Sequence, residues 1–215
     1  MVIDYTGTAL AFARPDEPQP PGTAPQVRAA LDRTLFTRGV SVLAAADAVD
    51  QNAFAVTRAF AGEHDVTTLS DLLPLAGRLR FGGPPECPER PFCLQGLEKV
   101  YGLDFGEVLS MPSRVATADA LRADQIDVGM LETTNSRLAI SGLILLTDDR
   151  ELQPHENVVP LVRTDALQRW GERLRTAFDD VSARLTTEDL VQLNRSVEVE
   201  GLSPADAAAL WWAGT

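Results

Sequence analysis

The sequence predicts an α/β protein with parallel sheet. Stretches with the pattern of strands alternate through the middle of the chain with stretches of helical periodicity, as in βαβ units. With 215 residues, of which 45% are hydrophobic, the chain can bury a sizeable core in one domain or two small lobes. The strongest apolar run, 138–146, is far shorter than the roughly 18 residues that a membrane span requires. These observations favour a globular α/β fold and no direct membrane insertion of this chain.

Strands and helices are expected in alternation. Residues 126–131 (IDVGML) form a continuous apolar run of the kind buried in parallel sheets. Proline-rich residues 14–25 have the composition of an exposed loop. The expected strands are 2–5, 40–45, 53–57, 78–81, 107–111, 126–131, 143–146 and 158–162. The expected helices are 9–13, 27–36, 68–76, 94–101, 117–122, 165–185, 187–197 and 204–212.

Charge and composition exclude several classes of partner. A net charge of −12 without a basic patch repels nucleic acid and anionic membranes. The only histidines, His64 and His155, lack the spacing of metal ligands, so we expect no metal and no cofactor. The first five residues already have the pattern of a strand, so no signal peptide is expected in this chain.

The stretch RLRFGGPPECPERPFC, residues 78–93, combines a strand end with a stiff loop. Gly82 and Gly83, followed by two prolines, are expected to end the strand. A disulfide between Cys87 and Cys93 is favoured over free thiols if the compartment is oxidising. Arg90 lies between these cysteines, where its guanidinium could bind a carboxylate or phosphate, or remain a solvated surface group.

Two further pairs of polar and aromatic residues are candidates for ligand binding. Tyr5 and Thr8 lie where a strand opens into a helix, so they could meet a ligand or serve as an ordinary helix cap. Asn52 and Phe54 face the same way on one strand, as part of a ligand-binding wall or of the core.

Catalysis is the weaker interpretation. Glu132 and Glu156 could act as paired carboxylates in acid/base chemistry, or be unrelated solvated acids. No arrangement of nucleophile and base and no phosphate-binding glycine motif is present. We therefore expect that the protein is not an enzyme.

Several segments together resemble one family. YTGTAL near the start, DQNAFAVT, the segment from residue 69 to residue 102, IDVGMLETT and LTDDRELQPHENVVPLVR occur in the order found in the osmoprotectant substrate-binding proteins of bacterial ABC importers. Those proteins bind glycine betaine, choline, carnitine or proline betaine. The resemblance implies a type II periplasmic-binding fold with two α/β lobes that close on a solute. It also implies delivery of the solute to ABC permease subunits outside the cytoplasm.

The resemblance also implies a division of the chain. Residues 1–50 would be a remnant of lobe I with the first crossing segment, and residues 51–133 would be lobe II. Residues 134–215 would carry the second crossing and return to lobe I with the C-terminal helices. Compared with the family, lobe I is expected to be incomplete at its N-terminus, as in an N-terminally truncated member.

The family's ligand-binding residues can be carried over to matching positions. Tyr5 matches a tyrosine of the aromatic cage that holds a quaternary ammonium, and Thr8 matches a hydrogen-bonding threonine. Phe54 matches a second cage aromatic, and Asn52 the polar residue just before it. Arg90 matches the arginine that binds the ligand carboxylate.

The remaining expected ligand-binding residues are Glu132, Thr133 and Glu156. Where betaine-binding relatives have further cage aromatics, this sequence has the two glutamates, which can attract a cation but offer no π face. The expected ligand is therefore glycine betaine or a related small polar solute. The alternatives are a sugar-like, polyhydroxy or phenolic ligand or, in a different class, an enzyme that uses Glu132 and Glu156.

Overall fold

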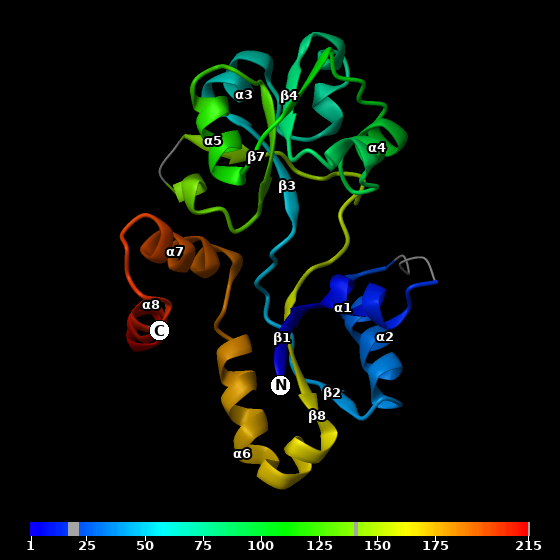
Figure 1. The fold of residues 1–215 in the computed structure, drawn as a ribbon, viewed down its shortest axis with the longest axis vertical. Helices are drawn as coiled ribbons and strands as arrows, with labels where there is room; N and C mark the ends of the chain where they lie inside the picture. The colour runs from blue at the N-terminus through cyan, green and yellow to red at the C-terminus, as the bar shows by residue number, and fades with distance from the viewer. Residues whose placement is uncertain (17–21, 140–141, 215) are drawn as a thin grey trace. The chain divides into compact units, whose positions relative to one another are not determined.

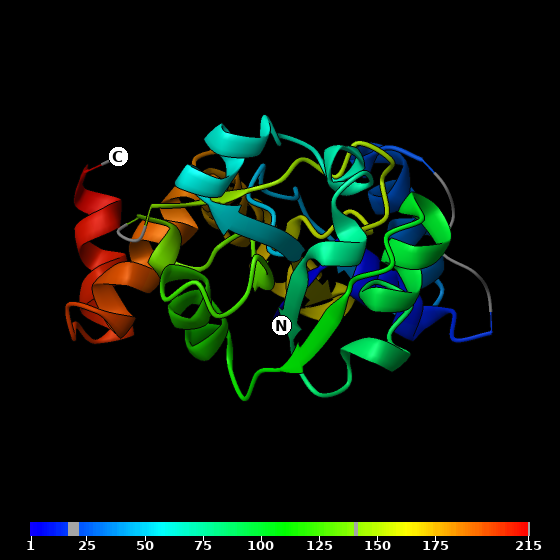
Figure 2. The same cartoon turned by 90° about the horizontal axis from the view of Figure 1, so that it is seen from above.

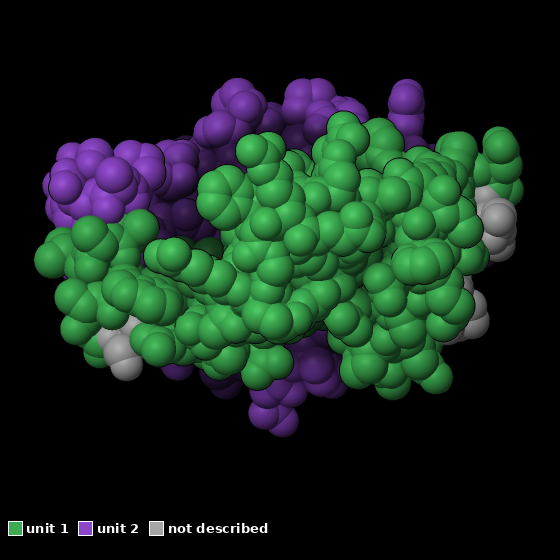
Figure 3. Space-filling model, turned by 90° about the horizontal axis from the view of Figure 1, so that it is seen from below, with its two compact units in different colours: residues 1–51, 154–190, 208–215 green, residues 52–153, 191–207 purple. Residues whose placement is uncertain are grey.

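The computed structural model describes residues 1–16, 22–139 and 142–214. The chain divides into two compact units, which are coloured separately in Figure 3. Unit 1 comprises Met1–Gln51, Pro154–Leu190 and Ala208–Thr215, and unit 2 comprises Asn52–Gln153 and Val191–Ala207. The elements of each unit can be followed in Figures 1 and 2.

Unit 1 contains a three-stranded sheet in the order β1-β8-β2. The strands are β1 (Val2–Tyr5), β2 (Val40–Val42) and β8 (Val158–Arg163), and β8 pairs antiparallel with both neighbours. The prediction of parallel sheet is therefore wrong for this unit. Strands β1 and β2 do run in the same direction, as a crossover through helices requires, but β8 lies between them in the opposite direction.

Helices α1 (Thr6–Ala13) and α2 (Ala24–Phe36) lie on one side of this sheet, and α6 (Thr164–Ser182) lies on the other, as Figure 1 shows. The buried side chains of Leu10, Leu31 and Val159 form the centre of the core between α1, α2 and the sheet. Of the expected loop 14–25, residues 17–21 lie outside the described part of the chain.

Unit 2 contains a five-stranded mixed sheet in the order β5-β4-β6-β3-β7. Strand β4 runs parallel to β5 and β6, whereas β3 runs antiparallel to β6 and β7. The strands are β3 (Asn52–Thr57), β4 (Arg80–Gly83), β5 (Glu107–Ser110), β6 (Val128–Glu132) and β7 (Leu143–Leu145). The predicted parallel pairing is thus confirmed around β4 alone.

Alternate residues of β3 enter different cores. Phe54 and Val56 pack with Phe81 in one core, while Ala55 packs with Leu121 of helix α5 (Arg114–Arg122) in another. The other described elements are α3 (Arg58–His64), η1 (Ser70–Leu72), η2 (Ala76–Arg78), η3 (Cys87–Glu89), α4 (Leu94–Gly96), the π-helical η4 (Leu97–Tyr101), η5 (Ser136–Ala139), α7 (Thr187–Glu198) and α8 (Pro204–Gly214).

Strand β4 continues through the two glycines that were expected to end it. A Cβ on Gly82 would lie 2.4 Å from Ile126 Cδ1, and one on Gly83 would lie 2.8 Å from the Phe81 ring. These positions are occupied by glycine because neighbouring side chains pack directly on the strand backbone.

The helix expected at 68–76 is replaced by short 3₁₀ turns, η1 and η2. Pro74 lies in the last turn of the predicted helix, where proline cannot donate the hydrogen bond that a continuous α-helix needs. The helix α3 was not predicted, although the Thr57 side chain caps it by accepting a hydrogen bond from the backbone N–H of Phe60 at 3.1 Å.

The second boundary between the units lies at Gln153, about twenty residues beyond the predicted position near residue 133. The reason is strand β7, which pairs with β3 through Ala55 and Leu145, so the chain completes the sheet of unit 2 before it leaves. None of the helices in the described ranges combines the length and apolar composition that crossing a membrane requires.

Candidate ligand-binding site

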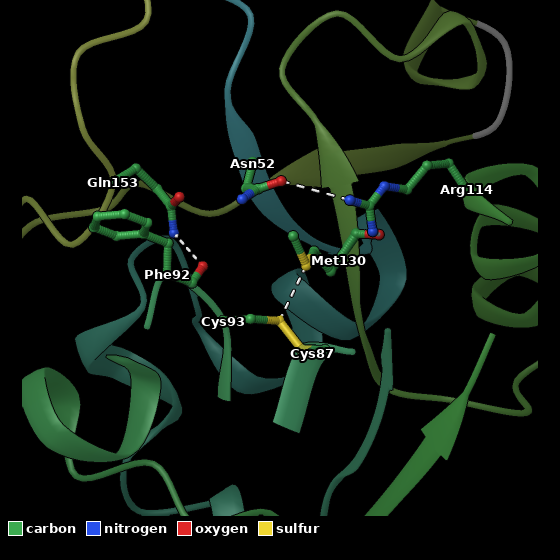
Figure 4. Close-up of a disulfide and its surroundings, with 7 residues drawn as sticks. All are labelled: Asn52, Cys87, Phe92, Cys93, Arg114, Met130 and Gln153. Carbon is green, nitrogen blue, oxygen red and sulfur yellow. Dashed lines mark hydrogen bonds between the residues drawn. A yellow bond between two sulfur atoms is a disulfide. The ribbon is translucent and has the colours of Figure 1, made fainter. Parts of the chain in front are cut away.

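The loop after β4 is closed by a disulfide between Cys87 and Cys93, as predicted, with the two Cα atoms 5.3 Å apart. Both cysteines are buried, and Met130 Sδ on β6 lies 3.0 Å from Cys93 Sγ (Figure 4). On the other side, Gln153 Nε2 donates a hydrogen bond to the Phe92 carbonyl at 2.9 Å. The loop is therefore fixed to the sheet beneath it and to the end of unit 2.

A pocket of about 300 Å³ opens beside this disulfide, wholly within unit 2. Its volume lies at the lower end of the range for small-molecule sites. The lining residues are Asn52, Pro84, Glu86, Cys87, Arg90, Pro91, Phe92, Cys93, Arg114 and Met130. The pocket thus lies between the disulfide loop, the start of β3, the middle of β6 and the start of α5.

Arg90 lines this pocket from the disulfide loop. Its backbone N–H donates to the Cys87 carbonyl at 3.2 Å, which helps to fix the loop around it. Among the described residues, its exposed guanidinium has no hydrogen bond or ion pair. All five guanidinium N–H donors are therefore free to bind an anionic ligand.

Arg114, at the start of α5, is the second arginine of the pocket and was not predicted. The Ser113 side chain begins the helix by accepting a hydrogen bond from the Ala116 N–H, which places Arg114 at the first helical position. Its Nε donates to Glu132 Oε1 in an ion pair, and its Nη2 lies 3.5 Å from Asn52 Oδ1. Figure 4 shows Arg114 extending toward Asn52 and Met130.

Strand pairing brings Asn52 and Glu132 together. They are direct partners across β3 and β6, and two pairs further along Phe54 is opposite Met130. Asn52 and Phe54 share a face, as predicted, but Phe54 is only 1% exposed and its ring lies 6.2 Å from that of Phe81. Phe54 is thus a core residue in this structure, whereas Asn52 lines the pocket. The aromatic ring that does line the pocket is Phe92, which the sequence analysis did not select.

The expected site residues of unit 1 cluster at the start of α1. Glu156 Oε2 accepts a hydrogen bond from the Thr8 N–H, and Oε1 accepts one from the Thr8 hydroxyl, both at 2.9 Å. A Cβ on Gly7 would lie 3.1 Å from the Glu156 carboxyl group, so glycine permits this close approach. Burial raises the pKa of Glu156, although the hydrogen bonds from Thr8 oppose the increase.

Tyr5 belongs to the same cluster. Its hydroxyl donates a hydrogen bond of 2.5 Å to Asp50 Oδ2. Burial, followed by this hydrogen bond, raises the pKa of Tyr5, so the phenol stays protonated at neutral pH. Thr133, the last expected site residue, lies in the turn after β6 and is not part of the pocket lining.

The model of the family described as the substrate-binding domain of ABC-type glycine betaine transport systems (OpuAC) matches residues 1–214. The chain belongs to this family. Its resemblance to osmoprotectant-binding proteins is thereby confirmed, as is its α/β fold of the type II periplasmic-binding class, which is shared with solved structures. Members of the family bind solutes for transport and are not enzymes.

Individual relatives agree with this assignment. The chain is 33% identical over 131 residues to a glycine-betaine-binding protein of Pseudomonas aeruginosa, which covers 60% of this chain and 42% of the relative. It is 30% identical over 164 residues to the glycine betaine-binding protein YehZ of Escherichia coli, covering 72% of this chain and 53% of the relative. The chain thus matches about half the length of these curated relatives.

Among solved structures, that of a glycine betaine/carnitine/choline ABC transporter superposes with a TM-score of 0.88 at 26% sequence identity. The superposition covers 99% of this chain and 77% of that one.

Proposed function

We propose that this chain is the solute-binding component of an ABC importer for an osmoprotectant such as glycine betaine or a related small polar solute. The observation that carries the proposal is the Arg90 guanidinium, which has no partner within the described ranges, at a pocket in a member of this family. A guanidinium fixed on a braced loop is suited to bind a ligand carboxylate with two parallel hydrogen bonds. The expected partners are the solute and ABC permease subunits, and the expected location is outside the cytoplasm.

The residues proposed for ligand binding differ in the kind of contact that each can make. Arg90 and Asn52 supply hydrogen-bond donors in unit 2, and Phe92 adds an aromatic ring to the same pocket. In unit 1, the Tyr5 ring is proposed as an aromatic contact for a cationic group, since its hydroxyl is held by Asp50. Thr8 and Glu156 are bonded to each other, so we assign them to holding the start of α1 in place.

An enzyme that uses Glu132 and Glu156 receives no support from their surroundings. Glu132 is ion-paired with Arg114 in unit 2, and Glu156 is hydrogen-bonded to Thr8 in unit 1. Each carboxylate already has a role in its own unit.

A thermal-shift screen tests the proposed function. Glycine betaine, carnitine, proline betaine, choline and a set of polyols are each added to this chain in excess. A solute at about 100 times its Kd adds about 2.7 kcal/mol to the free energy of unfolding, so the midpoint should rise by about 5 to 10 °C. The solute should be recovered unchanged. An unchanged midpoint with every compound, or chemical conversion of the solute, contradicts the proposal.

A further inference from the structure

The polar atoms around the unit 2 pocket are strongly biased toward hydrogen-bond donors, and the bias comes from how Arg114 is held. Its Nε donates to Glu132, its Nη1 lies 3.4 Å from the Met130 carbonyl, and its Nη2 lies 3.5 Å from Asn52 Oδ1. A guanidinium carries five N–H donors, so two remain. They have no partner among the residues that the structure describes.

The acceptors next to Arg114 are already engaged. Glu132 Oε1 accepts from Arg114, and Oε2 accepts from Asn135 Nδ2 at 3.2 Å. Asn52 Oδ1 faces Arg114, which leaves the Asn52 NH₂ group as its free end. Together with Arg90, the pocket therefore offers N–H donors from three side chains, whereas Glu86 is the one carboxylate among its lining residues.

A carboxylate is the ligand group that fits such a site, because an ionised carboxylate is an acceptor with two oxygens. Two guanidinium groups can each bond to it, in the charge-assisted geometry that gives the strongest hydrogen bonds. Binding of a ligand that carries a cation and a hydroxyl, but no carboxylate, would displace water from these donors without giving them a new partner. Sites of this kind reject ligands that lack the matching group.

We propose that Arg114 is a second carboxylate-binding arginine and that, with Arg90, it makes this pocket select a carboxylate-bearing solute over choline. This inference rests on the proposed function and narrows its substrate class to zwitterions such as glycine betaine. Glu132 then serves to orient Arg114, and the ligand cation is bound elsewhere.

Calorimetric titration of the whole chain with glycine betaine and with choline tests the assignment. Arg114→Gln removes the guanidinium, and Arg114→Gln/Glu132→Gln removes both charges of the ion pair, so that Glu132 is not left without its partner. Arg122→Gln is the matched control, because Arg122 lies at the exposed end of the same helix α5. Thermal unfolding of each variant shows whether it is folded.

The wild type should bind glycine betaine at least about tenfold more tightly than choline. Both Arg114 variants should lose about tenfold or more in glycine betaine affinity, while choline affinity changes by less than about threefold. Arg122→Gln should match the wild type. The dependence on the ligand carboxylate separates a binding role from a structural one.

Three results overturn the inference while the proposed function stands. These are unchanged glycine betaine affinity in the double variant, equal losses for both probes, and a wild type that binds choline as tightly as glycine betaine. If the wild type binds no osmolyte at all, the proposed function itself fails and takes this inference with it.

Discussion

Two groups of polar side chains differ in how many of their hydrogen-bonding atoms lack a partner. One group lines the unit 2 pocket, and the other lies at the start of α1 in unit 1. In unit 2, the Arg90 guanidinium has no partner among the described residues, and Arg114 retains two N–H groups. In unit 1, Thr8 and Glu156 bond to each other and Tyr5 bonds to Asp50. An unpaired donor at a pocket is available to a ligand, whereas a group bonded within the protein mainly stabilises the fold. Variants of Arg90 and Arg114 should therefore change affinity, and variants around Glu156 should change stability.

The largest effect is expected at Arg90. Arg90→Ala should weaken glycine betaine binding by about 2 to 5 kcal/mol if the bound ligand buries the pair of guanidinium and carboxylate, because truncation then leaves the ligand carboxylate without its charge-assisted partner. The midpoint of unfolding without ligand should stay within about 1 °C of the wild type, since the side chain is exposed and has no hydrogen bond or ion pair with the described residues.

For Arg90→Ala, calorimetry measures the affinity for glycine betaine, and thermal unfolding measures the midpoint without ligand. Arg78→Ala is the control, because Arg78 is an exposed arginine of unit 2 outside the pocket lining. Wild-type affinity in Arg90→Ala would remove this residue from the site.

An intermediate effect is expected from opening the disulfide. Replacing Cys87 and Cys93 by alanine should lower the free energy of unfolding by about 2 kcal/mol, because a cross-link over six positions restricts the unfolded chain. Glycine betaine affinity should fall severalfold as well, since the loop that carries Arg90 loses its closure. Denaturant unfolding and calorimetry check the two effects.

Reductant provides the matched control for the disulfide. The sequence contains two cysteines, so reduction of the wild type should reproduce the variant, and the variant should be insensitive to reductant. A loss of stability with no loss of affinity would mean that the disulfide is not what positions Arg90.

The smallest effect is expected at Glu156. Because burial raises its pKa, the native state holds the proton more strongly than the unfolded chain does. The stability contributed by this group is present at low pH and is lost as the pH rises above the ordinary range of a glutamate. Glu156→Gln keeps an oxygen that can accept a hydrogen bond from Thr8, and its side chain does not ionise. The variant should therefore lose less stability than the wild type as the pH rises.

Thermal unfolding between pH 4 and pH 7 should show the midpoint of Glu156→Gln rising relative to that of the wild type as the pH rises. Glu172→Gln, an exposed position on α6, is the control. Parallel curves for wild type and Glu156→Gln would show that the carboxyl group is not perturbed. A large loss of glycine betaine affinity in Glu156→Gln would contradict the assignment of Glu156 to stability rather than to binding.

The sequence alone could predict features that depend on neighbouring residues, but not those that depend on tertiary packing. The apolar run IDVGML predicted β6, and the spacing of Cys87 and Cys93 predicted their disulfide, because both depend on residues close together in the chain. The ion pair of Arg114 with Glu132 joins residues 18 positions apart, and it depends on where α5 packs against the sheet. No local pattern contains that information.

Phe54 shows that strand alternation predicts the face of a residue but not its burial. Alternation along a strand correctly placed it on the same face as Asn52, but it could not say where along that face the core ends. The position where the core ends is set by the register of β3 with β6. This register places Phe54 opposite Met130, and Asn52 lines the pocket. The antiparallel sheet of unit 1 was missed for a similar reason, because β8 pairs with strands more than a hundred positions earlier in the chain.

The most direct test of the central claim is a crystal structure of this chain with glycine betaine bound. We expect the ligand carboxylate to lie in the unit 2 pocket, with its oxygens about 2.7 to 2.9 Å from guanidinium nitrogens of Arg90 and Arg114. A carboxylate bound away from both arginines, with the Arg90 guanidinium in solvent, would contradict it.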